Sequence, residues 1–209
     1  MKDEWSFILS PLFSLESSYR RSRKTIMKTS LPPFVHSFPA PAVLIGCGTL
    51  DKPNLISVSW FGTVCSDPPM VCVGIRQSRH SYRLVHESRE FTVNIPRVSD
   101  LKAVQYCGSV SGRSINKFAE LGLTAVPCPP LEEAPMVAEF FLNLACQVEH
   151  EIHLGSHYLF IANVVGVHGE RQTGDFSHRP QLRSAEQLAY LDGKYWGLKP
   201  IEHVPSKKS

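Results

Sequence analysis

The sequence predicts a mainly β protein with a few short helices, arranged as a closed barrel. Short runs of β-favouring residues recur along the chain, separated by turn residues at the spacing of roughly 8–12 residues that is typical of barrels. The helical patterns between these runs are brief, and no internal repeat is present. With 209 residues, 43% of them hydrophobic and 20% charged, the chain is long enough for one domain with a substantial core.

The charge distribution argues against a nucleic-acid-binding protein. The formal net charge is +3, and the first thirty residues hold six basic side chains against three acidic ones. The remainder of the chain is therefore neutral, whereas a nucleic-acid groove needs a concentration of basic side chains.

The two ends of the chain differ from its middle. We expect residues 1–30 to be a disordered or spurious extension, residues 31–200 to form the domain and residues 201–209 to be a polar tail. Met27 is an alternative start, since the sequence after it leads directly into the predicted barrel. No apolar run approaches the ~20 residues of a membrane span. Acidic residues precede the first apolar run and the basic cluster follows it, which is the reverse of the order in a signal peptide. We therefore expect a cytoplasmic protein that binds no membrane.

Residues 54–81 predict two strands joined by a turn. Ile56, Val58 and Trp60 alternate with the side chains between them, which is the period of a half-buried strand. The pair Pro68-Pro69 ends this strand because proline lacks an N–H. Residues 70–75 are a nearly continuous β-favouring run, which is typical of a more buried strand.

The other elements follow from the same signals. Further strands are expected at residues 42–47, 90–95, 123–126, 140–154 and 158–168, with a turn at residues 48–53. Helices are expected at residues 81–87 with Ser78 as cap and Leu84 and Val85 facing inward, at 99–108 with Ser99 as cap, and at 114–122 with Ser114 as cap. Near the end, a helical turn is expected at residues 184–188, and Asp192-Gly193 predicts a hairpin between residues 189–191 and 194–196.

A phosphate site is predicted where the buried strand at residues 70–75 ends. Arg76, Arg79, His80 and Ser81 lie within six residues, at the expected start of a helix, and helix N-termini bind anions. Lys117 is distant in sequence but begins a short helix of its own. A solvated surface would explain any one of these cations alone, whereas the cluster favours a phosphate next to an apolar wall that carries the Trp60 indole.

The motif W-F-G-T-V-C-S-D-P-P-M-V, followed by R-x-x-R-H-S-Y, resembles the flavin reductase-like family with the FMN-binding split β-barrel. The flavoredoxin branch is the most similar, and the resemblance runs from about residue 41 to residue 198. It implies a split barrel, bound flavin mononucleotide (FMN) and a homodimer with the flavin near the interface.

The resemblance also implies a set of flavin contacts. Matching family positions fall on Ser81 and Lys117 for the phosphate, on Asn54 and Trp60 for the ring, and on Tyr190 for a late aromatic that covers the flavin. We further expect the backbone of a turn after Gly62 to approach the ring edge. The predicted cofactor-binding residues are Asn54, Trp60, Thr63, Val64, Cys65, Ser66, Arg76, Arg79, Ser81, Lys117 and Tyr190.

Some of these contacts have competing explanations. On one extended strand, Asn54 and Trp60 would be roughly 20 Å apart, which is long for one flavin ring. Either the strand bends, or the two residues contact different ends of the cofactor, or one serves a second subunit. Plain core packing explains Trp60 as well, and hairpin packing explains Tyr190 equally well.

The tripeptide G-S-H at residues 155–157 resembles the G-D-H signature of related flavin reductases. The resemblance places His157 near the flavin ring and the nicotinamide of the donor, which makes it the predicted catalytic residue. Ser156 replaces the acid, so the use of NADH or NADPH as donor stays open.

Other chemistries have little support. The six cysteines form no C-x-x-C motif, and most are expected to be reduced core residues, with Cys65 as the exception beside the site. Cysteine, histidine and acidic residues are too scattered for a recognisable metal site, so none is predicted. Motifs of dinucleotide-binding Rossmann proteins, P-loop enzymes and serine hydrolases are missing.

The leading hypothesis is an FMN-containing oxidoreductase that transfers hydride or electrons. It could act as a flavin reductase that delivers reduced flavin to a partner enzyme or to iron, or as a flavoredoxin that holds FMN and passes electrons to a partner protein. A non-catalytic flavin-binding barrel that serves as sensor or store is the alternative, and a barrel with a decayed site is a third.

Overall fold

The computed structural model describes residues 28–35, 38–169 and 187–198. The chain divides into two units, Met1–Val35 and His36–Ser209. Residues 28–35 are exposed and form neither helix nor strand, and all of the described helices and strands belong to the second unit. The predictions for residues 1–27 and 201–209 lie outside the described residues.

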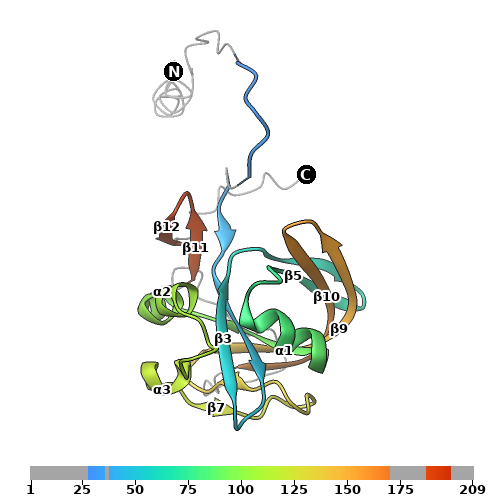
Figure 1. Ribbon diagram of the computed structural model, residues 1–209, viewed down its shortest axis with the longest axis vertical. Coiled ribbons are helices and arrows are strands. Elements are labelled where there is room, and N and C mark those ends of the chain that lie inside the picture. The colour runs from blue at the N-terminus through green and yellow to red at the C-terminus, as the bar shows by residue number, and fades with distance from the viewer. Residues whose placement is uncertain (1–27, 36–37, 170–186, 199–209) are drawn as a thin grey trace, which may run out of the picture. The chain divides into compact units, whose positions relative to one another are not determined.

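A curved, antiparallel sheet of seven strands forms the body of the second unit (Figure 1). Its spatial order is β3-β2-β6-β9-β10-β5-β4, so that two strands consecutive in sequence, β3 and β4, lie at opposite ends of the order. The strands are β2 (Val43–Gly48), β3 (Pro53–Val58), β4 (Phe61–Ser66), β5 (Pro69–Ile75), β6 (Glu90–Ile95), β9 (Leu142–Leu154) and β10 (His157–Gly169).

The sheet curls around one apolar core. Buried side chains from β2, β3, β5, β6, β9 and β10 meet in a single cluster, which includes Val73, Phe91 and Phe160. Val85 of α1 (His80–Ser88) enters the same cluster, and Leu84 packs against it. The helix thus lies against the inside of the curled sheet (Figure 1), with the two side chains inward as predicted.

The other helices cover the opposite face of β2 and β3. They are α2 (Leu101–Ser109), which a 3₁₀ turn at Val98–Asp100 precedes, and α3 (Lys117–Leu121). Strand β2 serves both faces with period two, because Val43 and Ile45 point into the barrel while Leu44 packs with Val104 and Phe118 of the helices.

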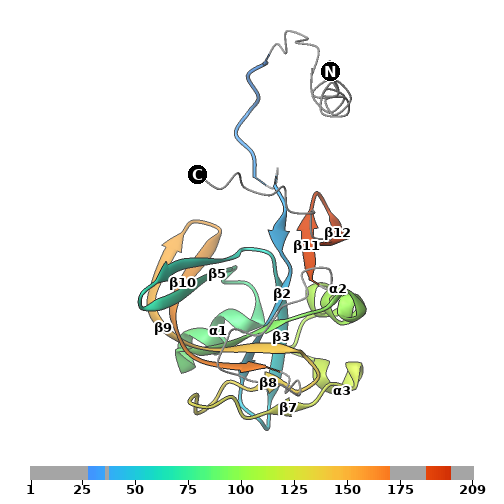
Figure 2. The ribbon, with the colours of Figure 1, turned by 180° about the vertical axis from the view of Figure 1, so that it is seen from behind.

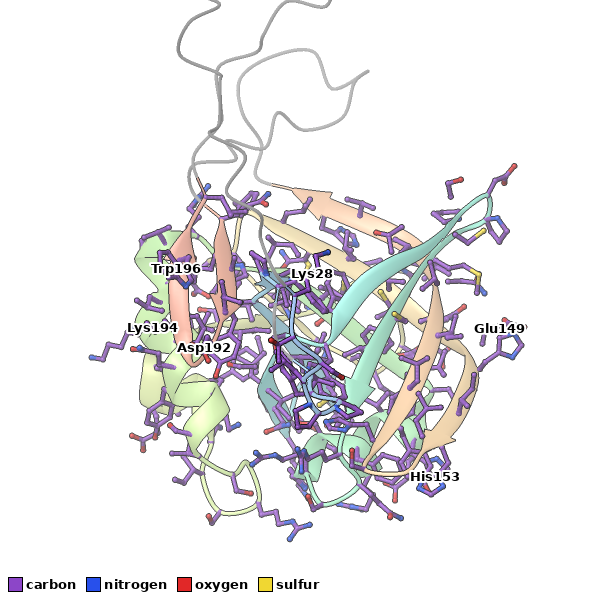
Figure 3. The ribbon with its side chains drawn as sticks, turned by 90° about the horizontal axis from the view of Figure 1, so that it is seen from above. Lys28, Glu149, His153, Asp192, Lys194 and Trp196 are labelled. Atoms are coloured by element: carbon purple, nitrogen blue, oxygen red, sulfur yellow. The ribbon has the colours of Figure 1, made fainter. Side chains whose placement is uncertain are left out.

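Two small sheets complete the unit. Strands β1 (Ala40–Pro41), β11 (Leu188–Leu191) and β12 (Lys194–Gly197) form one, and β7 (Ala125–Val126) pairs with β8 (Met136–Val137) in the other. Figure 2 shows the β7–β8 pair at the end of the unit opposite the β11–β12 hairpin. In Figure 3 the labelled Asp192, Lys194 and Trp196 mark this hairpin on one side, and Glu149 and His153 mark β9 on the other.

Most of the predicted elements are confirmed, and so is the mainly β fold with short helices. Strand β6 spans the predicted residues, and the hairpin turns at Asp192 and Gly193, whose φ angles of 49° and 76° suit the turn type that the pair predicts. The helical turn predicted at residues 184–188 falls mostly outside the described residues, and its last residue, Leu188, begins β11 instead.

The prediction of one continuous strand through Asn54 and Trp60 is wrong. Strand β3 ends at Val58 and β4 begins at Phe61. The chain turns at Ser59 and Trp60, where the Gly74 amide donates to the Trp60 carbonyl at 2.8 Å. The separation of roughly 20 Å that an extended strand would impose therefore does not apply.

The turn predicted at residues 63–66 is also wrong. These residues belong to β4 and pair with β5 through a register shift between Thr63 and Cys65. The reversal comes only at Asp67 and Pro68. The strand continues to Ser66 because a bulge, rather than a turn, absorbs the irregularity.

The three predicted serine caps are wrong, although the helices exist. Arg79, Asp100 and Asn116 occupy the N-cap positions, and Asn116 accepts hydrogen bonds from the Phe118 and Ala119 amides. Helix α2 also continues one residue past Gly108, whereas α3 ends at Gly122 with φ at 64°, as predicted.

Candidate functional site

A cavity of about 200 Å³ lies where α1 begins. Its walls come from the segment 78–81, the end of α2, the loop at residues 110–112 and Lys117 of α3. Among the described residues that line it, none carries a carboxylate, while Arg79, His80 and Lys117 are basic. The charged side chains of the lining are therefore all basic.

Lys117 is buried at 3% exposure, and its position is fixed by the backbone. Its ammonium donates to the carbonyls of Leu55 at 2.7 Å and Cys107 at 2.9 Å. Burial lowers the pKa of Lys117, since desolvation disfavours the charged form. An ammonium has three donors, so one N–H is left for a ligand in the cavity.

Ser81, Asn54 and Cys47 form a buried polar chain next to Lys117. The Asn54 amide donates to the Ser81 hydroxyl at 2.8 Å and to the Cys47 sulfur at 3.4 Å. The Ser81 hydroxyl thus receives a hydrogen bond and keeps its own proton for another acceptor. The Asn54 Oδ1 atom is buried and has no partner among the described residues, which is costly unless a ligand or water supplies a donor.

Gly112 lines the cavity, and Arg113 follows it in the same loop. A Cβ atom on Gly112 would lie 1.9 Å from Asn54 Oδ1, so only glycine lets the loop approach so closely. The Arg113 guanidinium donates to the Ser78 carbonyl at 3.3 Å and so ties this loop to the segment before α1. Neither residue is a predicted site residue, because their contacts span about thirty to sixty residues of chain and leave no local pattern.

The two predicted arginines lie in the turn that joins β5 to α1. The Arg79 amide donates to the Arg76 carbonyl at 3.0 Å, and Arg79 is the N-cap of α1. Both side chains are exposed, but only Arg79 lines the cavity.

Trp60 and His157 meet at the same end of β5. Their rings stack at 3.9 Å between centroids with an interplanar angle of 23°. Tyr158 lies opposite Ile75, so the register brings His157 next to Arg76. The Ser156 hydroxyl and His157 Nδ1 are 2.8 Å apart, and His157 is 9% exposed, so its imidazole is held between a hydroxyl and an indole.

The remaining predicted contacts lie elsewhere. Ser66 pairs with Pro69, six residues from Ile75, which is roughly 20 Å along β5. Thr63, Val64 and Cys65 lie on β4 between Phe61 and Ser66, and the Val64 side chain is exposed. Tyr190 packs edge-on against Tyr195 with centroids 5.1 Å apart, which is the hairpin packing that the sequence left open.

The six cysteines are all free thiols, and four of them are buried. Burial raises the pKa of Cys107 and Cys128 to about 11, and it also raises that of Cys47, Cys72 and Cys146. Among the described residues no group of three or more histidine, cysteine or acidic side chains is placed to hold a metal ion. No described helix is both long and apolar enough to span a membrane.

Comparison with known proteins identifies the family. The protein-family model described as "Flavin reductase like domain" matches residues 35–199 of this chain. The flavoredoxin of Desulfovibrio vulgaris (Miyazaki F) superposes with a TM-score of 0.76 and 29% identity over 85% of this chain and 96% of its own. The flavoredoxin from Methanosarcina acetivorans gives a TM-score of 0.77 and 26% identity over 86% and 95%.

A curated relative is the reductase component of a 4-nitrophenol 4-monooxygenase/4-nitrocatechol 2-monooxygenase from Rhodococcus opacus. It is 26% identical over 148 residues, which are 71% of this chain and 69% of the relative. With these likenesses, the chain belongs to the flavin reductase-like family with the split-barrel fold, and its role is that of a flavin-related oxidoreductase.

Proposed function

We propose that this protein binds FMN non-covalently and transfers hydride or electrons through it. The carboxylate-free cavity at the start of α1 carries the proposal, since Lys117 and Ser81 each keep a hydrogen-bond donor there. A phosphate monoester offers strong acceptor oxygens and up to two negative charges to these donors.

The residues present fit FMN. Lys117, Ser81 and Arg79 would hold the phosphate, and the α1 amides with their positive dipole end would support them. The buried and unpartnered Oδ1 of Asn54 accepts a hydrogen bond, so a flavin hydroxyl or N–H is a suitable partner. Trp60, at 38% exposure, offers an aromatic surface for a ring.

When bound, FMN supplies the hydride or electron transfer. The protein's own residues bind and orient it. We assign His157 as the catalytic residue at the reactive edge, because its imidazole is fixed by Ser156 and covered by Trp60. An imidazole held in this way can orient a donor or hold a proton at that edge.

The other predicted FMN-binding residues remain part of the proposal, although they do not line the cavity. Arg76 is adjacent to His157 in register but lies outside the cavity. The assignments of Thr63, Val64, Cys65, Ser66 and Tyr190 rest on the family resemblance alone. A second subunit in the proposed homodimer would be one way for them to reach a flavin.

Two types of flavin oxidoreductase fit this function, and they differ in their electron donor and acceptor. A flavin reductase would oxidise NADH or NADPH and pass reduced flavin to a partner enzyme or to iron. A flavoredoxin would keep FMN and pass electrons to a redox partner protein. Steady-state oxidation of NADH and NADPH with added flavin tests this choice, and no turnover with either nucleotide would exclude the reductase form.

We also propose that the protein is cytoplasmic. Its six cysteines are free thiols, and free thiols persist in the reducing environment of the cytoplasm.

The phosphate site is tested by comparing FMN with riboflavin, which lacks the phosphate. Arg79→Ala and Lys117→Met should each weaken FMN binding by about tenfold to a hundredfold, the value of one charge-assisted hydrogen bond. Riboflavin affinity should not change, because the ring contacts remain. Quenching of flavin fluorescence on titration measures both dissociation constants.

The exposed Lys102 on α2 supplies the matched control, and Lys102→Ala should leave both affinities unchanged. Equal affinity of the unaltered protein for FMN and riboflavin would contradict the phosphate site. The visible spectrum of the desalted protein then distinguishes a tightly held FMN from a flavin that exchanges as a substrate. Tight binding without reduction by any donor would instead favour the sensor or store.

A further inference from the structure

His80 belongs to the basic cluster from which the sequence predicts a phosphate site, and it lines the cavity, although it is not among the predicted cofactor-binding residues. It is the first residue of α1, between Arg79 and Ser81, and is partly buried. Its Cδ2 atom lies 3.4 Å from the point that a Cβ atom on Gly112 would occupy, so the ring faces the loop that closes the cavity. Among the described residues, neither ring nitrogen has a hydrogen-bond partner.

Among the described residues, the charged groups that act on this imidazole are all cationic. Arg83 acts on it from α1, Arg113 from the loop and Lys117 from α3, and Arg79, the N-cap of α1, is the preceding residue. The cavity also holds the Cys107 thiol, whose pKa of about 11 keeps it neutral near pH 7. A further positive charge at His80 would therefore be unfavourable while the cavity holds no anion.

The pKa of His80 reflects these surroundings. Burial lowers it below the ordinary 6.5, and Arg83, Arg113 and Lys117 lower it further. The imidazole of the free protein is thus neutral at pH 7. A phosphate monoester, with a charge of about −1.5 to −2 at that pH, reverses the balance because a nearby opposite charge favours the protonated form.

We propose that His80 is a further phosphate-binding residue, and that its imidazole takes up a proton from solvent when the FMN phosphate occupies the cavity. The inference rests on the proposed function and adds a regulation to it. Since proton and phosphate bind to the same cavity, each strengthens the binding of the other. Retention of the cofactor then depends on pH.

The direction follows from the two states of the imidazole. In the complex His80 holds its proton to a higher pH than in the free protein. The gain in FMN affinity is therefore fully present below the free-protein pKa, and it is lost as the pH rises through the pKa of the complex. Between the two values, the dissociation constant of FMN should rise by up to about tenfold per pH unit.

The phosphate group titrates as well, but with the opposite sign. Its second ionisation lies near pH 6, and the dianion that forms above this pH binds more tightly to cations. The two contributions are separated by removing His80 while keeping the ligand. Riboflavin reports the pH dependence of the ring contacts alone.

Calorimetric titration of the protein with FMN, in two buffers of different ionisation enthalpy from pH 5.5 to 8.5, measures the protons taken up. The unaltered protein should take up part of a proton that His80→Asn does not, and its FMN affinity should fall more steeply as the pH rises. His80→Arg, with a permanent charge, should bind FMN without that uptake. The matched control is His86→Asn, on the same helix, whose imidazole instead contacts Glu151 at 2.8 Å; it should behave like the unaltered protein.

Two failures are distinguishable. Identical proton uptake in the unaltered protein and in His80→Asn, together with a preference for FMN over riboflavin, would overturn the role of His80 and leave the phosphate site standing. No preference for FMN over riboflavin at any pH would overturn the proposed function and this inference with it. Unchanged riboflavin affinity in His80→Asn would show that the variant is folded.

Discussion

Lys117 and Glu90 are two buried charged residues that the backbone compensates in opposite ways. Lys117 donates to two carbonyls and keeps one N–H. The Glu90 carboxylate accepts from the amides of Glu132, Glu133 and Ala134 at 3.2, 2.9 and 3.3 Å, and Glu90 is not part of the lining of the phosphate cavity. The first charge is left with capacity for a ligand, whereas the second is committed to holding a loop.

Replacing Glu90 should therefore affect stability and not flavin binding. Glu90→Ala leaves three backbone amides without their acceptor, and we expect the free energy of unfolding to fall by about 2–4 kcal/mol. Urea denaturation measures this loss. Glu87→Ala is the control, because the exposed pair of Glu87 with Arg83 at 3.3 Å contributes little. Equal losses in the two variants would contradict the role of Glu90.

The individual site residues differed in how far the sequence could predict them. The cluster of Arg79, Ser81 and Lys117 could be recognised from residue type and position. Gly112 could not, since it is defined by a close approach to Asn54, and the cationic surroundings of His80 could not, since the charges come from three separate segments. Neither property leaves a local pattern in the chain.

The alternation of apolar and polar residues in strand β6 suggests one solvent-exposed face, and this is not what the structure shows. Phe91 and Val93 face the barrel core, while Glu90, Thr92 and Asn94 alternate with them and would be expected to face water. All three polar side chains are instead buried, and each bonds the backbone of residues 132–137. The alternation is real, but the polar face is covered by another segment rather than by solvent.

The element that carries Lys117 also depends on one polar side chain. Asn116 caps α3 through the Phe118 and Ala119 amides at 3.1 and 3.2 Å. Asn116→Ala should destabilise the helix by about 1 kcal/mol and weaken FMN binding up to about fivefold, because Lys117 is the first residue of the helix. Riboflavin binding, followed by fluorescence, should stay constant.

Ser114→Ala supplies the comparison for this helix. Ser114 has the residue type of a cap but is exposed and not at the cap position, so its replacement should change neither affinity. A larger effect from Ser114 than from Asn116 would restore the cap that the sequence predicted. Three serines were candidate caps by type, and only backbone geometry selects the residue that is used.

At the scale of the whole molecule, the chain closes on itself near its end. Strand β11 pairs with β1, and Leu188 enters the cluster that α2, α3 and the outer face of β2 share. The sequence predicted the hairpin from Asp192-Gly193 but not its partner, since pairing between residues 40 and 190 has no local signal. The strand runs were likewise predictable, whereas the order that separates β3 from β4 was not.

This closure should be measurable as stability. Leu188 is 5% exposed, so Leu188→Ala should lower the free energy of unfolding by about 2–5 kcal/mol through the cavity that it leaves. Leu154, at 56% exposure on β9, provides the control, and Leu154→Ala should stay within about 0.5 kcal/mol. Similar urea midpoints for both variants would mean that the last hairpin adds nothing to the core.

The burial of the cysteines makes the protein selective toward thiol reagents. A maleimide reacts with the thiolate and needs access to it, and five of the six sulfurs combine burial or partial burial with a raised pKa. Cys65, on β4, is only partly buried, and its sulfur lies 3.4 Å from the Asp67 carbonyl. A spin label or fluorophore would therefore attach first to this strand without any cysteine being engineered, and it would report directly on whether a second subunit covers β4.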